Sequence, residues 1–210
     1  MQRTLPRSIF QSLNISKTTK VRMSSKVDSS LNSAGLKPDQ TKALSERKML
    51  PQEGPIIAAI KELYSCKPTS NTFNIYAREA VFHDPVGIAK GIDSVRSQFF
   101  GLAKIFPRAD IPKFRILETP PTLPSNTILI DQDVAYYRDA KSTSPTKVVN
   151  SLLTLKLDNF NKVISHNEEW NHQKTTTGED GFLGMINEQR KKLTAGLTDV
   201  FVGGGSKGKN

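Results

Sequence analysis

The sequence contains a single cysteine, Cys66, among 210 residues. One thiol excludes an intramolecular disulfide and a cysteine-rich metal site. A single cysteine is consistent with a reducing compartment, or with a domain that needs no disulfide cross-link. No stretch approaches the roughly 18 apolar residues that a membrane-spanning helix requires. The N-terminus also lacks the continuous hydrophobic segment of a secretory signal. These absences predict an intracellular protein without a transmembrane helix.

Motifs that hold cofactors or build nucleophiles are missing as well. The three histidines, His83, His166 and His172, form no His-x-x-x-His pair. There is no phosphate-binding glycine loop between a strand and a helix, no dinucleotide fingerprint and no serine nucleophile elbow. We therefore expect no metal ion and no cofactor.

The net charge of +10 is concentrated at the two ends of the chain. Residues 1–27 carry six basic residues and no acid, residues 203–210 add two lysines, and +2 remains for residues 28–202. A domain that binds nucleic acid carries a basic surplus on its folded part. The charge distribution therefore predicts no nucleic-acid partner.

The basic N-terminus has two interpretations. Leu5, Ile9 and Leu13 would share one face of a short helix, as in an organelle presequence over residues 1–27. Alternatively, this stretch is a disordered polar tail, with a second candidate start at Met23. The expected location is accordingly mitochondrial or cytoplasmic. Residues 1–50 hold few large apolar side chains, so we expect them to be mostly flexible, with a short helix at most over 39–49.

The folded domain is predicted to span residues 51–175 and to begin with helices. Apolar residues recur at helical spacing in three segments, and Pro68 and Pro107 end the first and the third of them. The first of these predicted helices begins near residue 54 and stops at Lys67-Pro68, and the other two cover about residues 71–80 and 92–105. A further amphipathic helix is expected over about 182–200, within a C-terminal extension at 176–202, and a disordered tail at 203–210.

Beyond Pro107 the hydrophobic period changes from about 3.6 residues to two, which indicates strands. The connections between these strands are too short for parallel crossovers, so the sheet is predicted to be antiparallel. Helices followed by such a sheet define an α+β fold. The predicted strands cover about residues 113–119, 127–138, 147–158 and 162–171.

Short motifs occur in a fixed order where the helices meet the strands. They are Tyr76-x-x-x-Ala80-Val81-Phe82-x-Asp84-Pro85, then Gly91-Ile92, then Phe99-Phe100, then His166-x-Glu168-Glu169-Trp170-Asn171. Over residues 55–172 this set resembles the SnoaL-like branch of the NTF2-like superfamily. The resemblance implies a cone in which helices pack on a strongly curved antiparallel sheet. It implies no particular activity, because this superfamily includes isomerases, dehydratases, hydrolases, transport factors and scaffolds.

Alternation along the strands predicts which side chains enter the cone. The fourth strand contributes Ile164 and the polar pair His166 and Glu168 to its inward face. These two polar residues are neighbours, so His166 could act as a general base that Glu168 orients. A hydrogen-bonded structural cluster is the alternative. The candidate pocket-lining residues are Tyr136, Ser151, His166, Glu168 and Trp170, with Gln132 nearer the rim.

The catalytic sets of the family's enzymes do not map onto this sequence. Those sets include a buried Asp with a Tyr, a Tyr with a His, and an Asp-Arg-Asp group. Here Asp131 and Asp133 fall on the outward face by alternation, and Asp84 is most simply a turn or cap residue before Pro85. No catalytic residue is therefore assigned.

The outward face of the sheet is expected to be apolar enough to form a homodimer. The favoured interpretation is a non-catalytic dimeric module, either a scaffold or a binder of a small hydrophobic ligand in the cone. The alternative is a cofactor-independent isomerase, lyase or hydrolase that acts on a hydrophobic substrate there. The predicted dimer surface comprises Leu129, Ala135, Tyr137, Leu152 and Thr154.

Overall fold

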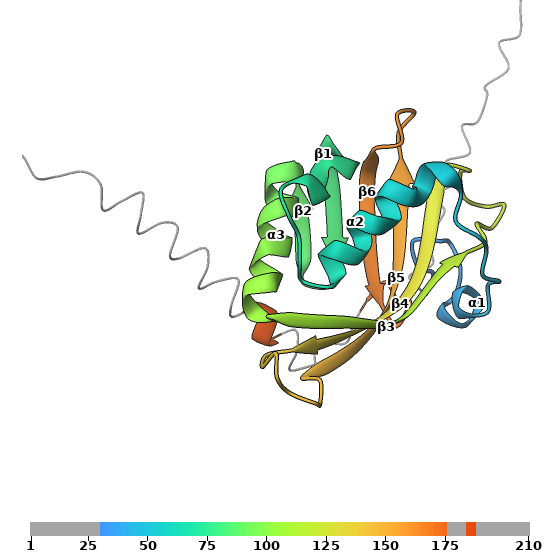
Figure 1. Cartoon of the computed structure of the whole chain (residues 1–210). Helices are drawn as coiled ribbons and strands as arrows, with labels where there is room; N and C mark the ends of the chain where they lie inside the picture. Colours follow the sequence, from blue (N-terminus) through green and yellow to red (C-terminus); the bar gives the residue numbers. More distant parts are fainter. Residues whose placement is uncertain (1–29, 176–183, 188–210) are drawn as a thin grey trace, which may run out of the picture.

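Two helices pack on the concave side of one curved sheet in the computed structural model, which describes residues 30–175 and 184–187 (Figure 1). The helices are α1 (Pro38–Lys42), α2 (Gly54–Tyr64) and α3 (Ile92–Ile105), with 3-10 turns η1 (Pro51–Glu53) and η2 (Asn71–Ile75). The strands are β1 (Tyr76–Asp84), β2 (Gly87–Lys90), β3 (Arg108–Leu117), β4 (Thr127–Tyr137), β5 (Lys147–Leu157) and β6 (Val163–Trp170). Within the described residues, no helix is long and apolar enough to cross a membrane.

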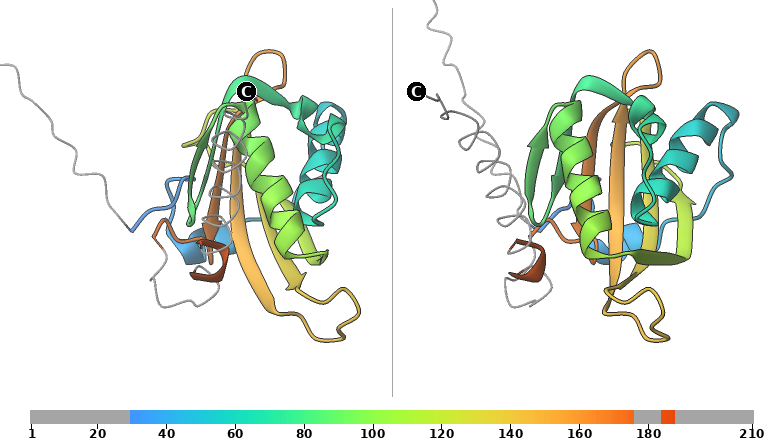
Figure 2. Two further views of the ribbon diagram at one scale, coloured as in Figure 1. Left: turned by 90° about the vertical axis from the view of Figure 1, so that its left-hand side faces the viewer. Right: turned by 60° about the vertical axis from the view of Figure 1, so that its left-hand side comes forward.

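The six strands lie in the order β2-β1-β6-β5-β4-β3. The meander from β3 to β6 is antiparallel, as the short connections predicted. Helices α2 and α3 cover the same face of the sheet, and the main hydrophobic core lies between them and the strands (Figure 2). The predicted α+β class is therefore confirmed.

Helices α2 and α3 match their predicted ranges because their ends are set by local chemistry. Pro55 occupies the first turn of α2, where its missing N–H costs nothing, and Gly91 precedes α3 with a φ of 80°. Val95 and Phe99 of α3 are buried one helical turn apart, so that α3 turns its apolar stripe to the sheet. These two helices position the inner wall of the cone.

The predicted second helix, over 71–80, is wrong. Only the 3-10 turn η2 forms there, and the chain continues as β1, which pairs antiparallel with β2 and parallel with β6. The burial of Tyr76 and Ala80 fits a helical period, but the burial of Ala80 and Phe82 fits the strand period of two. Pairing with two neighbouring strands decides between these alternatives, and it adds a parallel pair to the expected antiparallel sheet.

Register shifts in β3 and β6 displace side chains relative to simple alternation. In β3 the register shifts between Asp110 and Lys113, around Pro112, so the strand begins at Arg108 rather than near residue 113. A second shift lies opposite Ile164 in β6, which moves that side chain to the surface with 42% of its area exposed. The predicted inward position of Ile164 is therefore wrong.

Residues 30–47, here called the N-terminal strap, pack against the convex side of the sheet instead of remaining flexible. The backbone N–H of Arg47 donates to Ile116 O at 2.8 Å, and Glu46 bridges Leu117, so the strap also pairs with the edge strand β3. Ala34 is buried against Leu117 and its neighbours on the sheet. The expected flexibility of residues 1–50 is thus wrong for 30–47, and the helix expected over 39–49 is confined to α1.

The strap covers much of the predicted dimer surface. Arg108 stacks its guanidinium over the Tyr137 ring at 4.0 Å and shields another part of this face. The homodimer surface proposed from alternation is therefore buried within the chain. Its five residues each have at most 7% of their area exposed: Leu129, Ala135, Tyr137, Leu152 and Thr154.

Of the C-terminal extension, residues 184–187 are described and form a helical turn near the C-terminal end of α3 (Figure 1). Ile186 of this turn is buried in the main core. The remainder of the helix predicted over 182–200, the tail at 203–210 and the possible presequence over 1–27 lie outside the described residues.

Candidate functional site

A cavity of about 40 Å³ lies inside the cone, between α3, the turn after β1, and strands β4 and β6. Its apolar wall includes Phe82, Phe99, Leu102 and Ile186. This volume holds a few water molecules and is well below that of a drug-sized ligand. The polar residues on its wall are Asp84, Gln98, Tyr136 and Glu168, together with the indole of Trp170.

Three of the five predicted pocket residues line this cavity: Tyr136, Glu168 and Trp170. Ser151 and His166 do not. Ser151 is buried beside Gln132, whose Nε2 donates to Ser151 Oγ at 3.5 Å. Alternation therefore identified the inward face, but it did not distinguish cavity wall from packed core.

Glu168 is the buried acid of the cavity. Tyr64 donates its hydroxyl proton to Glu168 Oε2 at 2.9 Å, and Trp170 Nε1 donates to Oε1 at 3.2 Å. Burial, and then the nearby charge of Asp84, raise the pKa of Glu168 to about 8, although these hydrogen bonds and one from Ser151 act in the opposite direction. Glu168 therefore holds its proton at neutral pH.

Asp84 plays the turn role predicted for it and also reaches the cavity. Its Oδ1 accepts hydrogen bonds from the backbone N–H groups of Val86 at 2.9 Å and Gly87 at 2.8 Å. Its Oδ2 accepts one from Gln98 Nε2 at 2.7 Å. Three N–H donors suit an ionised carboxylate. The cavity wall thus carries a carboxylate that strand alternation could not place, because Asp84 ends β1, a strand the sequence did not predict.

His166 forms a structural cluster rather than a dyad with Glu168. Its Nδ1 lies 2.8 Å from the Tyr76 hydroxyl and its Nε2 lies 3.3 Å from the Tyr64 hydroxyl, which separates it from Glu168. The Phe82 ring packs edge-on against the imidazole at a centroid distance of 4.8 Å. Burial lowers the pKa of His166 to about 3, so the imidazole stays neutral. A proton on Nε2 satisfies this arrangement, with Tyr76 donating to Nδ1 and Nε2 donating to Tyr64.

Replacing Glu168 by glutamine should flatten the pH dependence of stability. The folded chain retains the Glu168 proton up to about pH 8, whereas an unfolded glutamate releases it near pH 4.3. Between these values the folded state binds the extra proton, so wild-type stability falls by up to about 1.4 kcal/mol per pH unit as pH rises. Urea unfolding at pH 5 and pH 8 should show Glu168→Gln gaining stability relative to wild type at the higher pH. Glu79→Gln, at an exposed position of β1, is the matched control, and an identical pH response of the two variants would contradict the assignment.

A second buried polar cluster lies on the opposite face of the sheet. Thr41 Oγ1 lies 2.8 Å from His172 Nδ1, and His172 Nε2 lies 3.1 Å from Asp131 Oδ1. A hydroxyl, an imidazole and a carboxylate in series resemble a hydrolase triad. However, all three side chains are buried between the strap, which carries Thr41, and the sheet, so a substrate has no access to the Thr41 hydroxyl. The cluster instead anchors the strap to the sheet.

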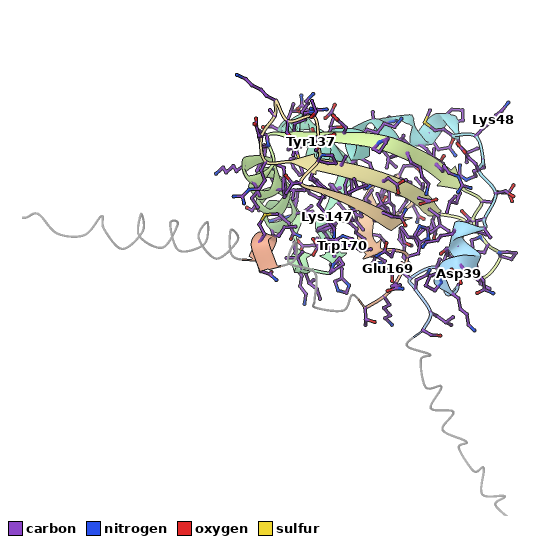
Figure 3. The ribbon with its side chains drawn as sticks, turned by 90° about the horizontal axis from the view of Figure 1, so that it is seen from below. Asp39, Lys48, Tyr137, Lys147, Glu169 and Trp170 are labelled. Carbon is purple, nitrogen blue, oxygen red and sulfur yellow. The ribbon has the colours of Figure 1, made fainter. Side chains whose placement is uncertain are left out.

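Glu169 forms a separate anchor for the strap. It follows Glu168 on β6 but points to the opposite face, where its carboxylate accepts a hydrogen bond from the Ser33 backbone N–H at 2.9 Å. Figure 3 shows Glu169 on the side of the molecule where α1 carries Asp39. Among the residues that the structure describes, no group of three or more His, Cys, Asp or Glu side chains is arranged to hold a metal ion.

The sequence matches no protein-family model and no curated protein. Solved structures do match. A steroid delta-isomerase from Pseudomonas aeruginosa is 13% identical, covers 71% of this chain and 99% of its own, and has a TM-score of 0.47. An NTF2-like protein from Anabaena variabilis is 9% identical, with 60% and 95% coverage and a TM-score of 0.47. A putative polyketide cyclase from Sinorhizobium meliloti is 15% identical, with 57% and 95% coverage and a TM-score of 0.42.

Identities this low concern the fold alone and say nothing of activity, substrate or partner. The class is that of α+β proteins in which helices close the concave side of a curved sheet. Within this class the observed architecture agrees with the cone that the resemblance of the sequence motifs to SnoaL-like, NTF2-like proteins implied.

Proposed function

We propose that the cone is a binding site for a small, largely apolar molecule that carries one polar group. The observation that carries this proposal is the grouping of Asp84, Gln98, Tyr136 and Glu168 on one cavity wall among aromatic and aliphatic side chains. Buried polar groups weaken a core unless they are fully satisfied, so folding alone does not favour placing them around a void. Apolar walls with a few convergent polar groups are typical of small-molecule sites.

The cavity is too small for the proposed ligand unless part of its wall moves. The present volume of about 40 Å³ leaves no room for a molecule of several carbon atoms. Ile186 is 7% exposed and is the described lining residue that follows the last strand in sequence, on the turn at 184–187. The ligand would take the place of this side chain, whose contact is apolar and therefore readily exchanged for a ligand's own apolar part.

Shortening Ile186 to alanine should therefore strengthen binding of small apolar probes such as 1-butanol by at least about tenfold. Loss of the larger side chain enlarges the cavity and leaves empty the space that the apolar part of the ligand would fill. Trp170, the only tryptophan of the chain, lines the cavity, so its fluorescence reports occupancy directly. Ile164→Ala, at the exposed position on β6, is the matched control and should leave binding unchanged. Unaltered Trp170 emission across a panel of butyl and phenyl probes in both wild type and Ile186→Ala would refute a ligand site.

The proposed module acts as a monomer rather than as the homodimer that alternation predicted. The burial of Leu129, Leu152 and Thr154 within the chain supports this, because it removes the apolar face that an isologous partner would cover. The strap covers this face and is therefore part of the proposed monomeric module.

A second candidate, a cofactor-independent isomerase, lyase or hydrolase, is favoured by a specific observation. Asp84, with its three N–H donors, and the protonated Glu168 line the same cavity and form a potential base and acid. In a bound ketone, Asp84 would take a proton from the carbon next to the carbonyl while Glu168 donates to the carbonyl oxygen. Exchange of that hydrogen in deuterated water by wild type, but not by Asp84→Asn, would separate catalysis from binding alone.

A further inference from the structure

One acceptor on the wall of the cone cavity lacks a donor. Gln98 Nε2 donates to Asp84 Oδ2 at 2.7 Å, which leaves Gln98 Oε1 buried and without a hydrogen-bond partner among the described residues. Turning the amide over would bring Oε1 against a carboxylate oxygen, which is also an acceptor, so the orientation of the amide is fixed. A buried acceptor without a donor is costly, so the site favours a molecule that donates to Oε1.

The two acidic side chains of this wall already have hydrogen-bond donors. Asp84 accepts three hydrogen bonds, one of them from Gln98. Tyr64 and Trp170 donate to the two carboxyl oxygens of Glu168. Among the described residues that line the cavity, Gln98 Oε1 is the one buried side-chain nitrogen or oxygen without a hydrogen-bond partner. Recognition of a ligand's polar group is therefore assigned to Gln98.

The chemistry of the remaining wall narrows the kind of donor. Among the described lining residues there is no lysine, arginine or histidine, so an anionic group would be buried without a counter-charge. An ammonium would give up its hydration for a largely apolar cavity. Ketones and ethers offer no donor, and an amide adds a second acceptor. A hydroxyl is neutral and supplies one donor, which also replaces the hydrogen bond of any water that it displaces from Oε1.

The position of Gln98 on α3 gives the direction in which such a ligand would lie. Gln98, Leu102 and Ile105 line the cavity from one face of α3, at the i, i+4 and i+7 spacing. The turn that carries Ile186 lies near the C-terminal end of this helix (Figure 1). A hydroxyl at Gln98 would therefore leave the rest of the ligand to run along α3 toward Ile186, against apolar side chains.

From this arrangement we propose that the ligand is an apolar molecule with a terminal hydroxyl, which donates its hydrogen bond to Gln98 Oε1 while the apolar remainder takes the place of Ile186. This inference rests on the proposed binding function and specifies the chemical class of the ligand. Gln98 is thereby the residue that determines specificity. The sequence did not indicate it, because Gln98 flanks the apolar stripe of α3 instead of lying within it.

The test uses two isomeric probes, 1-butanol and methyl propyl ether, which contain the same atoms, although only the alcohol donates a hydrogen bond. Full-length wild type and Ile186→Ala are titrated with each, and binding is followed by Trp170 fluorescence and by isothermal titration calorimetry. We expect Ile186→Ala to bind 1-butanol at least about fivefold more tightly than the ether, because only the alcohol satisfies Oε1. Equal affinities, or preference for the ether, would overturn the hydroxyl while leaving the binding site intact. Absence of binding by both probes in both proteins would overturn the proposed function itself.

A variant of Gln98 separates its hydrogen bond from the general polarity of the cavity. Gln98→Met in the Ile186→Ala background removes Oε1 with little change in side-chain length, and the preference for alcohol over ether should disappear. The variant also loses the Nε2 bond to Asp84, but this loss affects both probes alike, so the ratio of the two affinities is the readout. Gln52→Met, at an exposed position of η1, is the matched control and should keep the preference. An unchanged ratio in Gln98→Met would contradict recognition of the hydroxyl by Gln98.

Discussion

Replacing Asp131 by alanine should lower the free energy of unfolding by about 3–5 kcal/mol, the cost of removing one partner from a buried ion pair. Asp131 is 1% exposed and is the anionic centre between the strap and the sheet. Its Oδ2 lies 2.9 Å from Lys113 Nζ and 3.1 Å from Arg115 Nη1, while its Oδ1 faces His172. Removing the carboxylate takes their closest counter-charge from these groups, and urea unfolding monitored by circular dichroism measures the loss.

The matched control is Asp133→Ala, two residues along β4 on the same face. Asp133 is 31% exposed and lies 3.9 Å from Lys113 Nζ, so its replacement should cost less than about 1 kcal/mol. Asp131→Asn keeps the shape of the side chain and should still lose much of the stability, because the charge rather than the volume holds the cluster together. Similar losses for Asp131→Ala and Asp133→Ala would show that the buried charge is not the source of the effect.

The lowered pKa of Asp131 also predicts how acid reduces the stability of the fold. Burial alone would raise the pKa of Asp131, but hydrogen bonds and charge from His172 and Lys113 outweigh it and hold the pKa well below its usual value. An unfolded aspartate takes up its proton near pH 3.9, before the folded one does. The contribution of Asp131 is therefore complete above about pH 5 and is lost as pH falls below 4. In Asp131→Asn this part of the acid sensitivity disappears.

Local signals allowed part of the fold to be predicted from the sequence. The termini of α2 and α3 follow from Pro55, Pro68, Gly91 and Pro107, each of which acts within a few residues of itself. The segment from Tyr76 to Asp84 carries apolar residues compatible with both periods, and only its pairing with β2 and β6 makes it a strand. Where two local patterns compete, tertiary hydrogen bonding decides.

The strap could not be predicted because its stabilising contacts are distant and polar. Ser33 contacts Glu169 across 136 residues, and Asn32 Nδ2 donates to His172 O across 140 residues. Such pairs leave no hydrophobic period in the sequence. The sequence of this segment is poor in large apolar residues, which suggested flexibility. Its hydrogen bonds to the buried Glu169 and His172 order it instead.

Strand alternation predicted the part of the candidate site that lies on β4 and β6. Tyr136, Glu168 and Trp170 point into the cone as expected, because β4 and the end of β6 are regular. Asp84 and Gln98 come from a turn and a helix flank, for which the strand pattern carries no information. The cavity therefore combines one predictable wall with one that only the packing of α3 against β1 and β2 creates.

Introducing an acid at position 34 should detach the strap and expose the outer face of the sheet. Ala34 is fully buried against Leu117, Leu129 and Leu152. In Ala34→Asp a carboxylate would enter this small core, close to the residue whose backbone binds the Glu169 carboxylate. Burying an unpaired charge is costly, and release of the strap returns the new carboxylate to water. The strap should therefore leave the sheet and become cleavable by trypsin after Lys42, a site that wild type should protect.

Release of the strap should also change the oligomeric state. Leu129 and Leu152, once uncovered, form with Tyr137 the apolar face that strand alternation identified as a dimer surface. Analytical ultracentrifugation should find wild type monomeric and Ala34→Asp associating with increasing concentration. Ala43→Asp introduces the same charge at the exposed end of α1 and should behave as wild type. A monomeric, trypsin-resistant Ala34→Asp would show that the strap does not depend on this core, whereas a dimeric wild type would show that self-association uses a surface other than the one the strap covers.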